Sequence, residues 1–162
     1  MLSVLLSGLI LLIATTFIHY EVLRLAYARL PRLCVPARFK VMAVIFAAFG
    51  AHALEMVLYA CGFFLLAHYA GSGSLGPGHG LTLPGYLYFS AETYTSLGYG
   101  DVVPHQSLRM LAGMEALNGL LLIGWSSSTI YIAMEKFWAP VDEQEVGPAE
   151  INHVGKPLKP MQ

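Results

Sequence analysis

The sequence predicts an all-α membrane protein with three transmembrane helices and one shorter, re-entrant helical segment. Of its 162 residues, 56% are hydrophobic and only 12% are charged, and the mean hydropathy is +0.60. This composition lies outside the range of an ordinary soluble domain. Three apolar segments can each cross a hydrocarbon core of about 30 Å, and a glycine-rich stretch lies between the second and the third. The apolar composition makes membrane lipids the expected surroundings, and the formal net charge of −1 gives no indication of a nucleic-acid partner.

The first segment carries no charge from Leu2 to Ile18 and continues as a more amphipathic helix through Tyr27. At about 1.5 Å per residue, the uncharged run is about 26 Å long, and the following turns supply the remaining length. A cleaved signal peptide is the competing interpretation. Such a peptide begins with a basic region and ends at a small-residue cleavage site, and neither precedes Arg24. A transmembrane helix is therefore favoured.

A basic connection follows the first segment. Pro31 and Pro36 interrupt the helical pattern. Five of the nine Lys and Arg residues lie in or beside this connection, namely Arg24, Arg29, Arg32, Arg38 and Lys40. The positive-inside rule places the connection in the cytoplasm, and the N-terminus is then outside.

The second segment, from Val41 to about Tyr69, contains His52 and Glu55 near mid-membrane depth. A spacing of three places both on one face of a helix. An ionisable residue at this depth is costly unless it is paired. The pair either packs against another helix or senses pH, and packing is favoured. Candidate partners are His19, Glu115 and Asn118.

The two cysteines, Cys34 and Cys61, lie in or next to apolar segments. They are expected to be small buried side chains without a disulfide.

The stretch between the second and third segments contains two parts. Residues 71–80 are rich in glycine and uncharged, which predicts a flexible outer loop containing His79. Pro84 suits the first turn of a helix. Gly85 to Thr95 then gives about three turns, which is too short to cross a bilayer and suits a re-entrant helix.

The third segment begins near Ser107 and ends near Trp138, where Lys136 and Trp138 suit the membrane interface. Gly119 and Gly124 lie inside it. Each glycine is interpreted either as a hinge or as a site of close helix packing. After the third segment, the proline-containing and acidic residues 139–162 predict a disordered tail.

Gly98, Tyr99 and Gly100 place two glycines around one aromatic residue. Glycine permits backbone conformations that are closed to other residues, so successive carbonyl groups can point the same way. The fifteen residues from Ser90 to Pro104 resemble the pore loop of tetrameric potassium channels, and in particular that of the two-helix bacterial members. The nine matching positions are Ser90, Glu92, Thr93, Thr95, Gly98, Tyr99, Gly100, Asp101 and Pro104.

The resemblance implies a homotetramer with four chains around a central pore, multi-pass in the cell membrane and passively conducting potassium. The predicted segments are an N-terminal transmembrane helix, a cytoplasmic basic connection, an outer transmembrane helix, an extracellular loop, a pore helix with selectivity filter, an inner transmembrane helix and a cytoplasmic tail. Their ranges are 1–30, 31–40, 41–70, 71–83, 84–104, 105–138 and 139–162. A filter that opens outward requires the third helix to end inside, which agrees with the orientation from charge.

The resemblance also implies the site. Potassium ions would be coordinated by filter carbonyls, with no organic cofactor, at Ser96, Leu97, Gly98 and Tyr99, with Gly100 completing the filter. The Leu97 and Tyr99 side chains would point away from the axis. Threonine is usual at Ser96 and valine or isoleucine at Leu97, so the innermost site should be less well defined.

Three further side chains would support the filter. Glu92 and Asp101 match the carboxyl pair behind it, and Tyr88 is placed to donate a hydrogen bond to that pair. Two carboxylates this close should not both ionise, so one pKa is expected to rise. Counting from the filter makes Leu121 and Ser128 candidates for lining the cavity.

Two alternatives stay open: a poorly selective cation pore, and a non-conducting membrane scaffold or sensor with the same fold. An enzyme is not expected, because the nearest candidate for a catalytic or metal-binding pair is His52 with Glu55 alone.

Overall fold

The computed structural model describes residues 1–32, 34–76 and 81–138, so the predicted tail and His79 lie outside the described residues. Three long helices form, α1 (Leu2–Arg29), α2 (Ala37–His68) and α4 (Leu108–Trp138), with a short helix α3 (Leu83–Tyr94) between the last two. The long helices are each long and apolar enough to cross a membrane. The described residues contain no strand beyond an isolated bridge between Leu75 and Pro104. The all-α membrane fold with three spanning helices is therefore confirmed.

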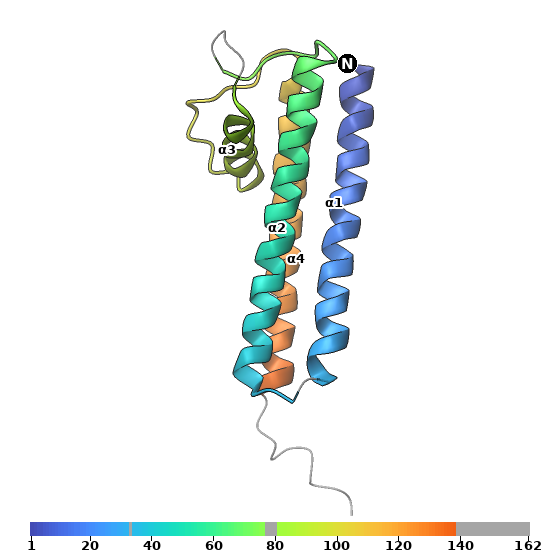
Figure 1. The fold of residues 1–162 in the computed structure, drawn as a ribbon, viewed down its shortest axis with the longest axis vertical. Helices are drawn as coiled ribbons and strands as arrows, with labels where there is room; N and C mark the ends of the chain where they lie inside the picture. Colours follow the sequence, from blue (N-terminus) through green and yellow to red (C-terminus); the bar gives the residue numbers. More distant parts are fainter. Residues whose placement is uncertain (33, 77–80, 139–162) are drawn as a thin grey trace, which may run out of the picture.

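The long helices run side by side, and α3 lies beside one half of α2 (Figure 1). Met1 and the loops around α3 are at one end of the bundle. The α1–α2 connection and the end of α4 are at the other. Helix α2 is central, because α1, α3 and α4 all pack on it.

Proline marks the starts of two helices. Helix α1 passes into a 3-10 turn at Leu30–Arg32, and α2 begins directly after Pro36, a few residues before the predicted start. Helix α3 begins at Leu83, which puts Pro84 in its first turn. Proline suits this position because its missing N–H would have no helical partner there.

The core that holds α3 lies between α2, α3 and α4. Tyr59 and Phe63 of α2 pack with Tyr86 and Phe89 of α3, together with Leu111 of α4. The Phe63 and Phe89 rings meet edge to face at 5.1 Å between centroids. This aromatic contact holds α3 against α2.

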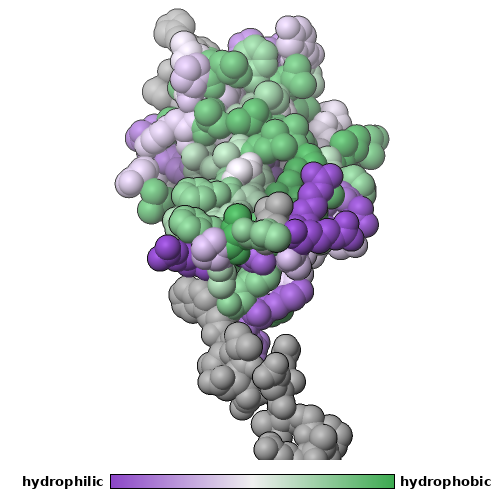
Figure 2. All heavy atoms as spheres, turned by 60° about the horizontal axis from the view of Figure 1, so that its bottom comes forward, coloured by the Kyte–Doolittle hydropathy of each residue, from purple (hydrophilic) through white to green (hydrophobic). Residues whose placement is uncertain are grey.

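The outer surface is largely apolar, as Figure 2 shows, with hydrophilic side chains gathered toward the end that carries the α1–α2 connection. Large exposed apolar side chains include Phe17, Phe46 and Phe49. At the hydrophilic end, the Lys136 ammonium lies 4.9 Å from the centre of the Tyr27 ring. This distribution suits a helix bundle surrounded by lipid tails.

The expected burial of the two cysteines was wrong: Cys34 and Cys61 are exposed in the single chain, and both thiols are free. The described part of the outer loop is anchored, because backbone hydrogen bonds join residues 72–76 to residues 103–107. Composition alone could not reveal these bonds, because their partners are more than twenty-five residues away.

Candidate functional site

The residues after α3 form a loop whose backbone N–H groups all turn back toward that helix. Five consecutive donors, from Thr95 to Tyr99, have acceptors on α3. The acceptors are, in order, the carbonyls of Ala91, Thr93, Glu92 and again Glu92, and the Glu92 side chain. The loop is therefore anchored to the helix through its donors alone.

The carbonyl groups of the same loop are unengaged. Within the part of the chain that the structure describes, no donor bonds to the carbonyl oxygens of residues 96–100. Residues 96–100 are exposed in the single chain, so their open carbonyls are accessible from outside it. A row of accessible carbonyls beside satisfied N–H groups is thus available for an external cation.

The backbone conformation alternates along this row. Ser96, Gly98 and Gly100 have φ of +57°, +55° and +82°, whereas Leu97 and Tyr99 between them have negative φ. Alternation of the sign of φ turns neighbouring carbonyls to the same side of the chain. Ser96 is unusual, because a non-glycine residue rarely adopts positive φ.

The predicted supporting side chains surround this loop. The Tyr99 N–H donates to Glu92 Oε2 at 3.2 Å, and the Tyr88 hydroxyl donates to both Asp101 oxygens at 3.2 and 3.1 Å. Among the described contacts, Glu92 and Asp101 do not hydrogen-bond to each other directly. The Leu97 and Tyr99 side chains are 59% and 70% exposed in the single chain.

The pKa of the Glu92 carboxyl group is raised above its ordinary value. Burial raises the pKa of Glu92, the nearby charge of Asp101 raises it further, and the hydrogen bond from Tyr99 N–H opposes both effects. The direction agrees with the expected rise of one pKa in the pair.

The residues that follow the carbonyl-bearing loop are hydrogen-bonded to the outer loop between α2 and α3. Gly76 N–H donates to the Val103 carbonyl at 3.0 Å, and His105 N–H donates to the Ser74 carbonyl at 2.9 Å. A Cβ at Gly73, where φ is +141°, would collide with the His105 carbonyl oxygen. Gly73 is therefore required for this close approach.

Polar side chains buried among the helices link the four helices. The Ser90 hydroxyl of α3 lies within hydrogen-bond distance of the Met56 carbonyl, at 2.8 Å, and of Glu115 of α4. Asn118 donates to Thr15 of α1 at 2.8 Å. Hydrogen bonds of this kind join helices in a membrane, where unsatisfied polar groups are costly.

His52 and Glu55 are joined by a contact of 3.3 Å, and Glu55 also bonds to His19 Nδ1 at 2.9 Å. His19 was one of the three candidate partners. The pair further contacts Tyr94, at the end of α3, and Ser126 of α4. The carboxylate therefore lies where all four helices meet.

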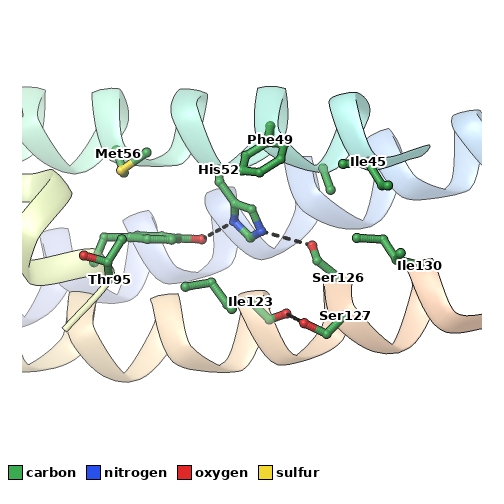
Figure 3. Close-up of a pocket in the computed structure, with 11 residues that line it drawn as sticks. Ile45, Phe49, His52, Met56, Thr95, Ile123, Ser126, Ser127 and Ile130 are labelled. Atoms are coloured by element: carbon green, nitrogen blue, oxygen red, sulfur yellow. Dashed lines mark hydrogen bonds between the residues drawn. The ribbon is translucent and has the colours of Figure 1, made fainter. Parts of the chain in front are cut away.

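His52 also lines a pocket of about 320 Å³, shown in Figure 3. The imidazole reaches across this pocket from α2 to Ser126 on α4, with Met56 and Thr95 farther along the wall. The pocket thus runs from the His52 cluster to the first residue of the loop.

The candidate residues of α4 lie in two environments. A Cβ at Gly119 would collide with the Tyr94 carbonyl oxygen, whereas nothing lies within 4 Å of a Cβ at Gly124. Gly119 is thus a close contact between α4 and α3. Leu121 and Ser128 are exposed on the single chain, and the Ser128 hydroxyl bonds back to the Gly124 carbonyl.

Sequence reasoning missed Tyr94 and Ser126 as members of the His52 cluster. In the sequence, Tyr94 is one residue of the re-entrant segment, and Ser126 is the first of four consecutive hydroxyl residues that end at Thr129. Ser126 differs from its neighbours, because Ser127, Ser128 and Thr129 all bond back to carbonyls one turn earlier. No local signal distinguishes it, since its imidazole partners are 74 and 107 residues away.

Three long apolar helices, a short helix packed on two of them and a loop of open carbonyls define a membrane protein of the ion-channel class. Comparison with protein families agrees: the model for a family described as "Ion channel" matches residues 41–136. The chain therefore belongs to this ion channel family, and α1 lies outside the matched residues. No match was found among curated proteins or among solved structures.

Proposed function

We propose that the chain forms a potassium-selective channel in which four copies surround a central pore. Potassium ions are coordinated by the carbonyls of Ser96, Leu97, Gly98 and Tyr99, and Gly100 completes the filter. The channel is passive, has no enzymatic activity and needs no organic cofactor. It lies in the cell membrane in contact with lipids, with the N-terminus outside and the C-terminus in the cytoplasm.

One observation carries this proposal: five consecutive N–H groups bond to α3 while the following carbonyls accept no described hydrogen bond. Rings of carbonyls replace the hydration shell of potassium in channel filters. One chain supplies only one side of such a ring, which is why symmetric copies are needed. Tyr99 between two glycines matches the potassium-selective pattern.

The pore helix adds an electrostatic contribution. The C-terminal end of α3 at Tyr94 leads directly into the loop. Its dipole places partial negative charge beside the inner end of the carbonyl row, which favours a cation. Glu92, Asp101 and Tyr88 then support the loop from its other side.

The proposal is tested by flux from liposomes that contain the purified full-length chain. Potassium should leave loaded vesicles much faster than sodium, and barium should block this flux because it has nearly the radius of potassium and twice its charge. Equal flux of potassium and sodium would favour the poorly selective pore. No flux from correctly assembled protein would favour the scaffold.

A further inference from the structure

A cluster of metal-ligating side chains lies outside the loop, where the four helices meet. His19 comes from α1, and His52 and Glu55 come from α2. One ligand atom from each of these three residues lies within 4.8 Å of the other two. Side chains of His19 and Glu55 are fully buried, and that of His52 is 14% exposed.

This cluster contains more close polar contacts than its hydrogens can turn into hydrogen bonds. Glu55 contacts both imidazole Nδ1 atoms and the Tyr94 hydroxyl, which itself lies 2.9 Å from His52 Nδ1. Ser126 Oγ lies 3.0 Å from Nε2 of His19 and 3.0 Å from Nε2 of His52. These are six contacts, but two neutral imidazoles, one phenol and one serine supply four hydrogens and an ionised carboxylate supplies none.

A cation between the Nδ1 atoms and the carboxylate removes this shortage. We propose that His19 Nδ1, His52 Nδ1 and the Glu55 carboxylate bind a divalent transition-metal ion of the Zn²⁺ class, with the Tyr94 hydroxyl oxygen in the fourth position. The contacts of His52 Nδ1, the Tyr94 hydroxyl and Glu55 Oε2 with one another then become edges of a coordination shell and need no hydrogens. The contact of His19 Nδ1 with Glu55 Oε1 is replaced by the bond from His19 to the ion.

The observed distances are close to those of such a shell. Bonds of 2.0–2.2 Å from Zn²⁺ to nitrogen and oxygen make the edge of a tetrahedron about 3.4 Å. His52 Nδ1 lies 3.3 Å from Glu55 Oε2 and 2.9 Å from the Tyr94 hydroxyl, and His19 Nδ1 lies 2.9 Å from the other carboxylate oxygen, Oε1. The ligand atoms are therefore close to the required separations, and a turn of the Glu55 carboxylate brings His19 and His52 to the same oxygen.

Ser126 completes the arrangement from outside the shell. When both imidazoles bind the ion through Nδ1, each carries its hydrogen on Nε2. Both N–H groups then donate to Ser126 Oγ, which has two lone pairs to accept them. Metal-bound histidines almost always donate their second nitrogen in this way, which fixes the ring orientation.

A bound ion has a structural consequence. Of the three ligand residues, His52 lines the pocket that extends to Thr95, so this pocket is the side from which an ion would approach the cluster (Figure 3). Once bound, the ion links α1 and α2 to Tyr94, the residue that ends α3. His19 lies outside the part of the chain that matches the channel family.

The test measures metal content and is independent of conduction. Full-length protein in detergent is stripped with a chelator, dialysed against Zn²⁺ and analysed for zinc per chain. Wild type should hold about one ion per chain. His19→Gln, His52→Gln and Glu55→Gln should each lose it. His68→Gln should keep it, because His68 is on the same helix and bonds instead to the Phe64 carbonyl.

A second measurement guards against variants that fail to fold. Wild-type protein loaded with Co²⁺ should show the strong visible absorption of a tetrahedral site with nitrogen and oxygen ligands. Absence of stoichiometric zinc and of this absorption would overturn the proposal and leave a proton as the cation in the cluster. Zinc retained by folded His52→Gln protein would also overturn it, because the ion would then be bound elsewhere.

Discussion

Gly98 has φ of +55°, and apart from its chain neighbours no atom of the described residues lies within 4 Å of a Cβ built there. A side chain added at Gly98 therefore meets no steric obstacle in the protomer. The free-energy cost of the substitution comes only from the left-handed backbone conformation. The left-handed conformation costs an ordinary residue about 1–2 kcal/mol. Relief of that cost would rotate the carbonyls that flank the residue.

Gly98→Ala should therefore abolish potassium flux while leaving the helices folded. Gly71→Ala is a matched control, because Gly71 has φ of +56° and equally open surroundings but lies in the outer loop. The measurement is liposome flux for both variants. Normal flux through Gly98→Ala would contradict the role of this backbone conformation.

Glu92 contributes a pH dependence whose sign follows from its raised pKa. The folded chain binds this proton more tightly than the unfolded chain, so the stabilisation is present at low pH and is lost as pH rises through the raised pKa. Glu92→Gln removes the titration while its amide oxygen still accepts from Tyr99 N–H.

The variant should thus show a smaller fall in Tm than wild type as pH rises above the ordinary glutamate pKa of 4.5. Glu21→Gln, which affects only an exposed pair with Arg24, should behave as wild type. Equal pH slopes for Glu92→Gln and wild type would show that Glu92 does not titrate as described.

At the scale of elements, the contact between α3 and α4 depends on Gly119. Any Cβ there would meet the Tyr94 carbonyl oxygen, which is backbone and cannot rotate away. Overpacking of this kind typically costs about 1–3 kcal/mol.

Gly119→Ala should therefore lower the thermal stability of the purified protein. Gly113→Ala is the control on the same helix, because nothing lies within 4 Å of its Cβ. Tm values of both variants in detergent test this. If Gly119→Ala melts no earlier than Gly113→Ala, the close contact is not needed for stability.

The long helices could be predicted from sequence because each is an apolar run with a proline or a polar segment at its boundary. The re-entrant helix could be placed from its short length and from Pro84. The partners of the buried polar side chains could not be predicted from the sequence. Ser126 contacts His19, which is 107 residues away along the chain, and Tyr94 contacts Glu55, which is 39 residues away. Such contacts follow from the packing of helices, which local patterns do not encode.

The glycine-rich loop shows the same limit. Its composition predicted flexibility, yet residues 72–76 are hydrogen-bonded to the segment that follows the filter loop. The supporting role of Tyr88 could be predicted, because the resemblance to potassium-channel pore loops implied it together with the carboxyl pair of Glu92 and Asp101. The structure places the Tyr88 hydroxyl within hydrogen-bond distance of Asp101.

At the scale of the whole molecule, the proposed orientation puts the α1–α2 connection in the cytoplasm. Cys34 lies in this connection and is exposed, and Cys61 is the second cysteine of the chain. In a Cys61→Ser background, a charged thiol reagent should modify Cys34 in sealed right-side-out vesicles only after they are permeabilised. Labelling of Cys34 in intact vesicles would show that the α1–α2 connection lies outside, opposite to the proposed orientation. A variant lacking both cysteines measures background.

In the proposed channel, a row of open carbonyls makes the assembled pore selective for potassium. The reversal potential of the full-length channel tests this selectivity in a planar bilayer with potassium on one side and sodium on the other. We expect a displacement toward the potassium equilibrium potential of more than about 59 mV, the value for a tenfold preference for a monovalent ion. A reversal potential near zero would show that the pore does not select potassium.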